Sequence, residues 1–152
     1  MLCIPDVSVV FTDVVSSTRL YQELGDRVAS GLISQHLRDV STTIHDGGGL
    51  VIKYTGDGLV ALFEDPLDAL DAVWSTLLYT ELPIRSSIHR GSALCRHDEF
   101  YGMSIHVAAR LIEHAEPGEC VSSLLIDRRR EQLTIRGVQE PLLVSRFTAC
   151  RI

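Results

Sequence analysis

The chain has 152 residues, of which 45% are hydrophobic, and its 14 basic and 20 acidic side chains give a formal charge of −6. A chain of this length buries roughly 70% of its unfolded surface, so we expect one domain over residues 1–152 with a conventional core. The acidic balance argues against a nucleic-acid-binding protein, which would need a basic face, but it does not exclude a nucleotide as ligand. No apolar stretch approaches the ~20 residues that span a bilayer. Four singly scattered cysteines favour reduced thiols in a cytoplasmic protein.

Hydrophobic periodicity and turn residues predict an alternation of strands and helices. In the first half we expect a strand over 7–11, a helix from Ser17 or Thr18 to residue 44 with a kink at Gly25, and a hairpin over 49–63. A helix starting at Asp65-Pro66 and a strand over 85–91 should follow. Beyond them we expect a polar link over 95–99, a helix over 103–115, and strands near 120–122, 133–135 and 142–147. The helix after Pro66 is expected to bury Leu67, Val73 and Trp74. The order is that of an α+β fold, a ferredoxin-like βαββαβ core with an appended αββ piece.

Two carboxylates at strand ends suggest a divalent-metal site. Asp57 lies in the tight turn of the hairpin, and Asp13 follows the first predicted strand. We expect the first and second strands to be neighbours, which would bring Asp13 close to the hairpin turn. Together the two carboxylates could hold two Mg²⁺ or Mn²⁺ ions that act on a phosphate. The alternative interpretation is that Asp57 is an ordinary turn residue and Asp13 a helix cap.

Phosphate and base contacts can be proposed for two further segments. Residues 14–18 connect a strand to a helix, and free backbone N–H groups at a helix N-terminus suit an anion such as a triphosphate. Lys53 is the only lysine of the chain, and within a strand its ammonium could donate to a purine ring. The alternative for residues 14–18 is a connecting loop that binds nothing. The alternative for Lys53 is a lysine exposed to solvent without a ligand.

The helix predicted over 103–115 carries two polar residues on one face. His106 and Arg110 are four residues apart, so both project from the same side of the helix. A guanidinium there could stabilise the charge of a pentavalent phosphorus transition state. The alternatives are a surface ion pair of Arg110 with Glu113 or Glu116, and an ordinary polar helix residue at His106.

Nine short segments occur along nearly the whole chain in a characteristic order and spacing: FTDVVSST (11–18), LGD (24–26), GG (48–49), KYTGDG (53–58), IHRG (88–91), YG (101–102), AARL (108–111), PG (117–118) and RGVQEP (136–141). This combination resembles the catalytic domain of the class III nucleotidyl cyclases, the adenylate and guanylate cyclases. The resemblance implies the class III cyclase fold and a head-to-tail homodimer with active sites at its interface.

The resemblance also implies roles for individual residues. It assigns the metal site to Asp13, Val14 and Asp57, recognition of the base to Lys53 and Glu99, transition-state stabilisation to Arg110, and triphosphate binding to Arg136. Ser16, Ser17 and Thr18 are the residues of the strand-to-helix connection that we expect to bind the triphosphate as well. The position of the family's ribose-orienting asparagine is occupied by His106. Glu99 and Arg136 stand where the family commonly has an aspartate and a lysine, and the region between residues 123 and 136 is shorter than usual.

The function that follows is a phosphorus–oxygen lyase that forms a 3′,5′-cyclic nucleotide and pyrophosphate from a nucleoside triphosphate with two Mg²⁺ or Mn²⁺ ions. We favour ATP, because Lys53 can donate to adenine N1 while a carboxylate accepts from the 6-amino group. One alternative is a cyclase with another base preference, either GTP or a pyrimidine, as in antiviral signalling by cyclic UMP or cyclic CMP. The other is a catalytically weakened domain that binds nucleotide for regulation.

Overall fold

The computed structural model describes residues 1–126 and 128–149. Its elements in chain order are β1 (Leu2–Val14), α1 (Ser17–Leu24), α2 (Asp26–Asp46), β2 (Leu50–Tyr54), β3 (Gly58–Phe63), α3 (Pro66–Tyr79), β4 (Ile84–Arg96), β5 (Glu99–Tyr101), α4 (Met103–Leu111), a 3₁₀ turn (Ile112–His114), β6 (Glu119–Ser122), β7 (Glu131–Leu133) and β8 (Leu142–Thr148). None of the helices in these residues is long and apolar enough to cross a membrane.

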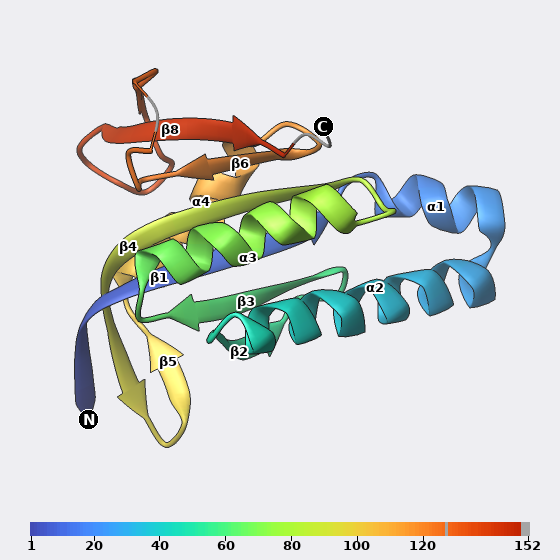
Figure 1. Cartoon of the computed structure of the whole chain (residues 1–152), viewed down its shortest axis with the longest axis horizontal. Coiled ribbons are helices and arrows are strands. Elements are labelled where there is room, and N and C mark those ends of the chain that lie inside the picture. The colour runs from blue at the N-terminus through green and yellow to red at the C-terminus, as the bar shows by residue number, and fades with distance from the viewer. Residues whose placement is uncertain (127, 150–152) are drawn as a thin grey trace.

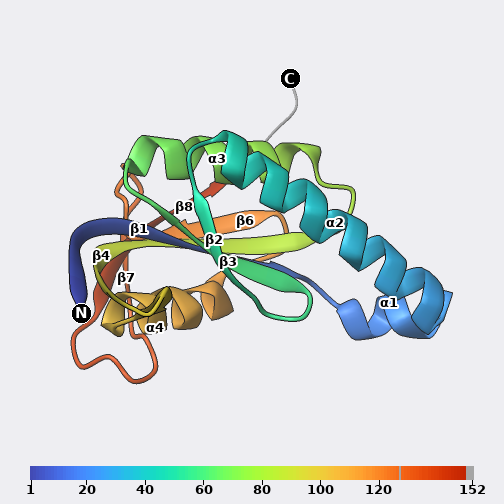
Figure 2. The same cartoon turned by 90° about the horizontal axis from the view of Figure 1, so that it is seen from below.

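The strands form a mixed sheet with helices on both faces. Its order is β2-β3-β1-β4-β6-β8-β7, and β5 pairs with β4. Helices α2 and α3 cover one face and α4 covers the other (Figures 1 and 2). The central strand β1 is antiparallel to both β3 and β4, whereas β4 and β6 are parallel. The predicted α+β fold with its ferredoxin-like core is confirmed.

Alternating side chains of the central strands build a core on each face of the sheet. Val10 and Leu59 pack with α2 and α3 on one side. Val9 and Val60, each one residue away along its strand, pack on the α4 side. All six residues of β3 are buried, since this strand lies between β1 and β2 and is covered on both faces. A buried central pair, β1 and β3, therefore fixes the position of the turn that carries Asp57.

Local sequence signals account for the helix boundaries. Gly25 adopts φ 81° and separates α1 from α2, so the predicted kink is a complete break. The Asp65 side chain accepts a hydrogen bond from the Leu67 N–H at 2.8 Å and caps α3, with Pro66 in its first turn as predicted. Val73 is buried, but Leu67 and Trp74 are exposed, and the Trp74 ring stacks on Phe147 at 6.0 Å between centroids.

Two expectations about the sheet were wrong. The neighbour of β1 is β3, the second strand of the hairpin, and not β2. The residues expected to form a polar link belong to a β4–β5 hairpin, whose turn places His97 and Asp98 at positive φ. The strands expected near 120–122, 133–135 and 142–147 correspond to β6, β7 and β8, with β7 ending at Leu133, so the appended part contains three strands. Cys3, Cys95 and Cys120 are free thiols, and Cys150 lies outside the described residues.

Candidate active site

Asp13 and Asp57 lie next to each other, as predicted, although the neighbouring strand is a different one. Asp13 is paired with Gly58 at the end of the β1–β3 ladder. The N–H of Val14 donates to the carbonyl of Asp57 at 3.1 Å, which ties the end of β1 to the β2–β3 turn. The main chain therefore holds the two carboxylates together.

Two glycines allow this turn to lie against β1. Gly56 has φ +90°, a backbone conformation that L side chains rarely adopt. Gly58 faces the β1 main chain so closely that a Cβ there would lie 1.9 Å from the Thr12 carbonyl oxygen. A side chain at Gly58 would push the turn, and with it Asp57, away from Asp13.

The environment of Asp13 disfavours its charged form. Burial is the main cause, and a hydrogen bond to Asp57 together with the negative charge of Asp57 adds to it, so the pKa of Asp13 rises from 3.8 to about 6. Arg85 acts in the opposite direction, since its Nη2 donates to Asp13 Oδ2 at 3.3 Å. Two adjacent carboxylates with one cationic neighbour keep an excess of negative charge, so a bound cation would stabilise their charged forms.

The donor set at this place fits Mg²⁺ or Mn²⁺, which prefer oxygen ligands. Asp13 and Asp57 offer carboxylates, and the buried Val14 has only its main-chain carbonyl to offer. Within residues 1–126 and 128–149, no group of three or more histidine, cysteine, aspartate or glutamate side chains could hold a metal. Further ligands would therefore have to come from the substrate, from water or from the main chain.

The connection from β1 to α1 differs from the expected anion site in part. The N–H groups of Val14 and Val15 are not free, because they donate to the carbonyls of Asp57 and Pro83. Ser16, with φ 58°, occupies the N-cap position of α1 without a capping hydrogen bond from its side chain, so the expected N-cap at Ser17 or Thr18 was wrong. The N–H groups of Ser17 and Thr18 open α1, where the helix itself offers them no acceptor, and a cavity of about 350 Å³ borders Val14, Val15 and Ser16.

Arg110 and Arg136 come together at an exposed carboxylate. Glu113 Oε1 accepts from Arg110 Nη1 at 3.3 Å and from Arg136 Nη2 at 2.9 Å. Slight burial acts to raise the pKa of Glu113, but the two guanidiniums outweigh it and lower that pKa overall. The surface ion pair of Arg110 with Glu113, one of the alternatives considered from the sequence, is therefore present within the single chain.

The three remaining predicted residues lie at separate exposed positions. Lys53 is on β2, where it pairs with Val60 of β3, and His106 is on α4 one turn before Arg110. Glu99 begins β5 and accepts a hydrogen bond from the Tyr101 hydroxyl. In the described part of the chain, no hydrogen bond or ion pair joins Lys53 to Glu99, or either aspartate to Arg110.

Sequence reasoning missed Arg85 as a partner of Asp13, and it considered Glu113 as a partner of Arg110 but not of Arg136. Arg85 reaches Asp13 because the β1–β4 register pairs the two residues, and a register between distant strands has no local sequence signal. Glu113 could be proposed as a partner of Arg110 from its three-residue spacing, but its contact with Arg136 spans 23 residues.

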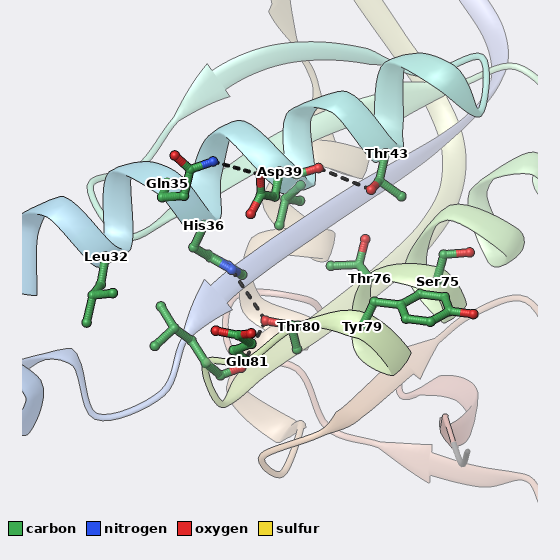
Figure 3. Close-up of a pocket in the computed structure, with 12 residues that line it drawn as sticks. Leu32, Gln35, His36, Asp39, Thr43, Ser75, Thr76, Tyr79, Thr80 and Glu81 are labelled. Atoms are coloured by element: carbon green, nitrogen blue, oxygen red, sulfur yellow. Dashed lines mark hydrogen bonds between the residues drawn. The ribbon is translucent and has the colours of Figure 1, made fainter. Parts of the chain in front are cut away.

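A separate cavity of about 240 Å³ lies between α2 and α3 and contains none of the predicted site residues (Figure 3). His36 projects toward Thr80 there, with Nδ1 3.3 Å from Thr80 Oγ1. The Thr80 hydroxyl itself donates to the Leu82 carbonyl at 3.0 Å, so His36 Nδ1 is the donor in this pair. Burial lowers the pKa of His36 and favours its neutral form.

Sequence relatives of the chain include uncharacterized and named proteins, although no family model matches it. An uncharacterized protein of Mycobacterium tuberculosis is 25% identical over 146 residues, which are 88% of this chain and 39% of the relative. The adenylate cyclase of Glutamicibacter nicotianae is 29% identical over 123 residues, or 78% of this chain and 30% of the relative. The chain thus spans 39% or less of the length of these two relatives.

Solved structures match over nearly the whole chain. The adenylyl cyclase CyaB from P. aeruginosa has a TM-score of 0.82 at 20% identity, covering 99% of this chain and 98% of the other. The guanylyl cyclase Cya2 has a TM-score of 0.80 at 14% identity, covering 94% and 91% of the two chains. These matches, with the distant adenylate cyclase relative, confirm the resemblance seen in the sequence: the chain has the fold of the class III adenylate/guanylate cyclase catalytic domain.

Proposed function

We propose that this domain is a nucleotidyl cyclase that converts a nucleoside triphosphate, with ATP favoured, into a 3′,5′-cyclic nucleotide and pyrophosphate. The observation that carries the proposal is the crowded Asp13–Asp57 pair on a class III cyclase fold. Bound to these carboxylates, two Mg²⁺ or Mn²⁺ ions would lower the pKa of the ribose 3′-hydroxyl and neutralise phosphate charge.

The chain's own residues would bind and orient the substrate. The free N–H groups of Ser17 and Thr18 at the start of α1, with Ser16 before them, suit the triphosphate. Arg136 would bind its terminal oxygens, and Arg110 would stabilise the charge that develops on the α-phosphate. His106, four residues before Arg110, has a ring N–H group that can donate to the ribose in place of an asparagine amide.

We further propose that the active site is shared between two copies of the chain. Asp13 and Asp57 form one cluster and Arg110 and Arg136 another, and in residues 1–126 and 128–149 no ion pair joins these two aspartates to these two arginines. A head-to-tail homodimer would bring the aspartate cluster of one copy to the arginines and Lys53 of the other. A nucleoside triphosphate substrate and free thiols at Cys3 and Cys95 agree with a cytoplasmic site of action.

The base preference rests on Lys53 and Glu99. An ammonium that donates to N1 and a carboxylate that accepts from the 6-amino group favour adenine over guanine. The guanylyl cyclase Cya2 has the same fold, so GTP is the alternative that this comparison supports. A pyrimidine preference and a weakened regulatory domain are further alternatives, because His106 and Glu99 alter the positions that would touch ribose and base.

Product identification separates these functions. Purified protein is incubated with equal amounts of ATP, GTP, CTP and UTP and with Mn²⁺, and the products are identified by mass spectrometry. We expect cyclic AMP and pyrophosphate, with no cyclic product from an Asp57→Ala variant that retains the wild-type unfolding transition. Cyclic GMP, cyclic CMP or cyclic UMP as the main product would overturn the choice of ATP. Tight nucleotide binding without release of pyrophosphate would support the regulatory alternative.

A further inference from the structure

One carboxylate joins the two arginines to which the proposed function assigns phosphate chemistry. Glu113 Oε1 is 3.3 Å from Arg110 Nη1 and 2.9 Å from Arg136 Nη2. The two guanidinium nitrogens therefore lie no more than about 6 Å apart, their greatest separation when both contact the same oxygen. Arg110 is on α4, whereas Arg136 is in the segment between β7 and β8, so Glu113 connects two parts of the fold.

The bridge is too exposed to be explained by stability of the fold. The side chains of Arg110, Glu113 and Arg136 are 45%, 43% and 68% exposed. Ion pairs with this exposure contribute little to stability, because water and salt screen them. What the bridge does is hold two long cationic side chains close together on a surface where they would otherwise repel each other.

A carboxylate and a phosphate satisfy the same guanidinium donors. Both are oxyanions that accept N–H groups of arginine with similar geometry, and a phosphate group carries the greater charge. Any phosphate that binds both arginines must displace Glu113 or share them with it. If Glu113 stays nearby, its negative charge opposes the incoming anion.

We propose that Glu113 is a resident anion that occupies the position of a phosphate group between Arg110 and Arg136 and competes with substrate triphosphate and product pyrophosphate. This inference rests on the proposed function of the two arginines. Glu113 keeps the arginines paired before substrate arrives, weakens binding of phosphate in the ground state, and eases departure of pyrophosphate. It is a positioning residue, because it acts through Arg110 and Arg136.

The test measures binding of inorganic pyrophosphate, with Mg²⁺ present, by isothermal titration calorimetry. The variants are Glu113→Gln, which removes the charge and keeps the shape, and Glu116→Gln as a matched control. Glu116 is exposed on the same segment and contacts neither arginine in the described structure. We expect Glu113→Gln to bind pyrophosphate about threefold to tenfold more tightly, as loss of one competing surface charge predicts, with the gain shrinking at high salt. Glu116→Gln should match the wild type.

Steady-state kinetics provide a second measurement. In Glu113→Gln, the KM for the triphosphate and the inhibition constant of pyrophosphate should fall together.

Unchanged or weaker pyrophosphate binding in Glu113→Gln, with an unaltered unfolding transition, overturns the inference, and Glu113→Ala provides a second variant for the same comparison. Pyrophosphate binding can be measured without turnover, so the two proposals can fail separately. If the protein makes no cyclic nucleotide but Glu113→Gln still binds pyrophosphate more tightly, only the proposed function is refuted. If the protein is an active cyclase but Glu113→Gln binds pyrophosphate as the wild type does, only the proposal for Glu113 is refuted.

Discussion

Arg85 and Asp13 form an ion pair across β1 and β4, with Arg85 Nη2 donating to Asp13 Oδ2 at 3.3 Å. The pair is partly buried and lies beside Asp57, so Arg85 is the one protein cation that offsets two adjacent carboxylates in the described structure. Its charge does not fully compensate, because the pKa of Asp13 remains raised to about 6. The aspartate pair is thus a strained electrostatic arrangement, as is common at functional sites.

Asp13→Asn should stabilise the metal-free protein while it abolishes turnover. The folded pKa of Asp13, about 6, is above its ordinary value of 3.8, so the folded state binds the proton more tightly. The charged carboxylate therefore costs stability progressively as pH rises from about 4 to 6, and the full cost is present above about pH 6. We expect a gain of ~1–2 kcal/mol at pH 7, lowered by the loss of a partner for Arg85, and almost none at pH 4.

Urea unfolding of the wild type and Asp13→Asn at both pH values, in the presence of a chelator, checks this expectation. An equal difference in unfolding free energy at pH 4 and pH 7 would show that the charge of Asp13 is not the cause.

Asp57→Asn should lower the pKa of Asp13. The hydrogen bond to Asp57 and the charge of Asp57 both raise that pKa, and the substitution removes the charge. The value should stay above 3.8, because burial is the largest cause and remains. Carboxyl chemical shifts of Asp13 followed by NMR over pH 3–8 give the two titrations. A pKa that does not move would place the two carboxylates farther apart than described.

Mixing two inactive variants should restore activity if the site is shared between copies. Arg110→Ala should lower kcat by about 10²-fold or more, as expected for a lost transition-state donor, and Asp57→Ala should abolish turnover. A mixed dimer has one site with both defects and one site with neither. Activity should therefore return on mixing, up to about a quarter of the wild-type rate if subunits exchange randomly. Each variant alone at twice the concentration is the control, and no recovery despite proven subunit exchange argues for a site within one chain.

Gly58→Ala should damage both the fold and the site. A Cβ at this position meets the Thr12 carbonyl oxygen at 1.9 Å, and that atom belongs to the main chain of β1, which cannot turn away. We expect a loss of about 1–3 kcal/mol in unfolding free energy and a larger fractional loss of activity, because the turn that carries Asp57 shifts. Gly31→Ala is a matched control, since a Cβ there meets nothing within 4 Å. Thermal unfolding and cyclase assays compare the two variants.

His106→Asn should retain the proposed activity or raise it. The exposed side chain shares a helix face with Arg110, and an amide can orient a ribose without the bulk of an imidazole. For His106→Asn we expect kcat/KM to stay within about tenfold of the wild-type value or to rise. His106→Ala should lower kcat/KM below the wild-type value, because the hydrogen-bond donor is lost. Should the asparagine variant prove as poor as the alanine variant, the imidazole itself would be required.

The order of elements and their approximate bounds could be predicted from local patterns alone. Gly25, the Asp65-Pro66 cap and the turn at Gly56 act on their own neighbours, so their effects are visible in a short stretch of sequence. The β4–β5 hairpin was missed because His97 and Asp98 occupy its positive-φ turn positions without a glycine. The exposure of Leu67 and Trp74 was missed because an apolar residue on a helix signals burial only when a neighbour covers it.

Residue types and motifs were enough to identify the residues that are chemically suited to the reaction: two aspartates at strand ends, one lysine and two arginines. Which of these residues lie together depends on the packing of the folded chain. Pairing of β1 with β3 joined Asp13 to Asp57, the β1–β4 register added Arg85, and Glu113 joined Arg110 to Arg136. Strand register and side-chain contacts between distant segments depend on the packing of the whole sheet, whereas capping and turn preferences depend on a few consecutive residues.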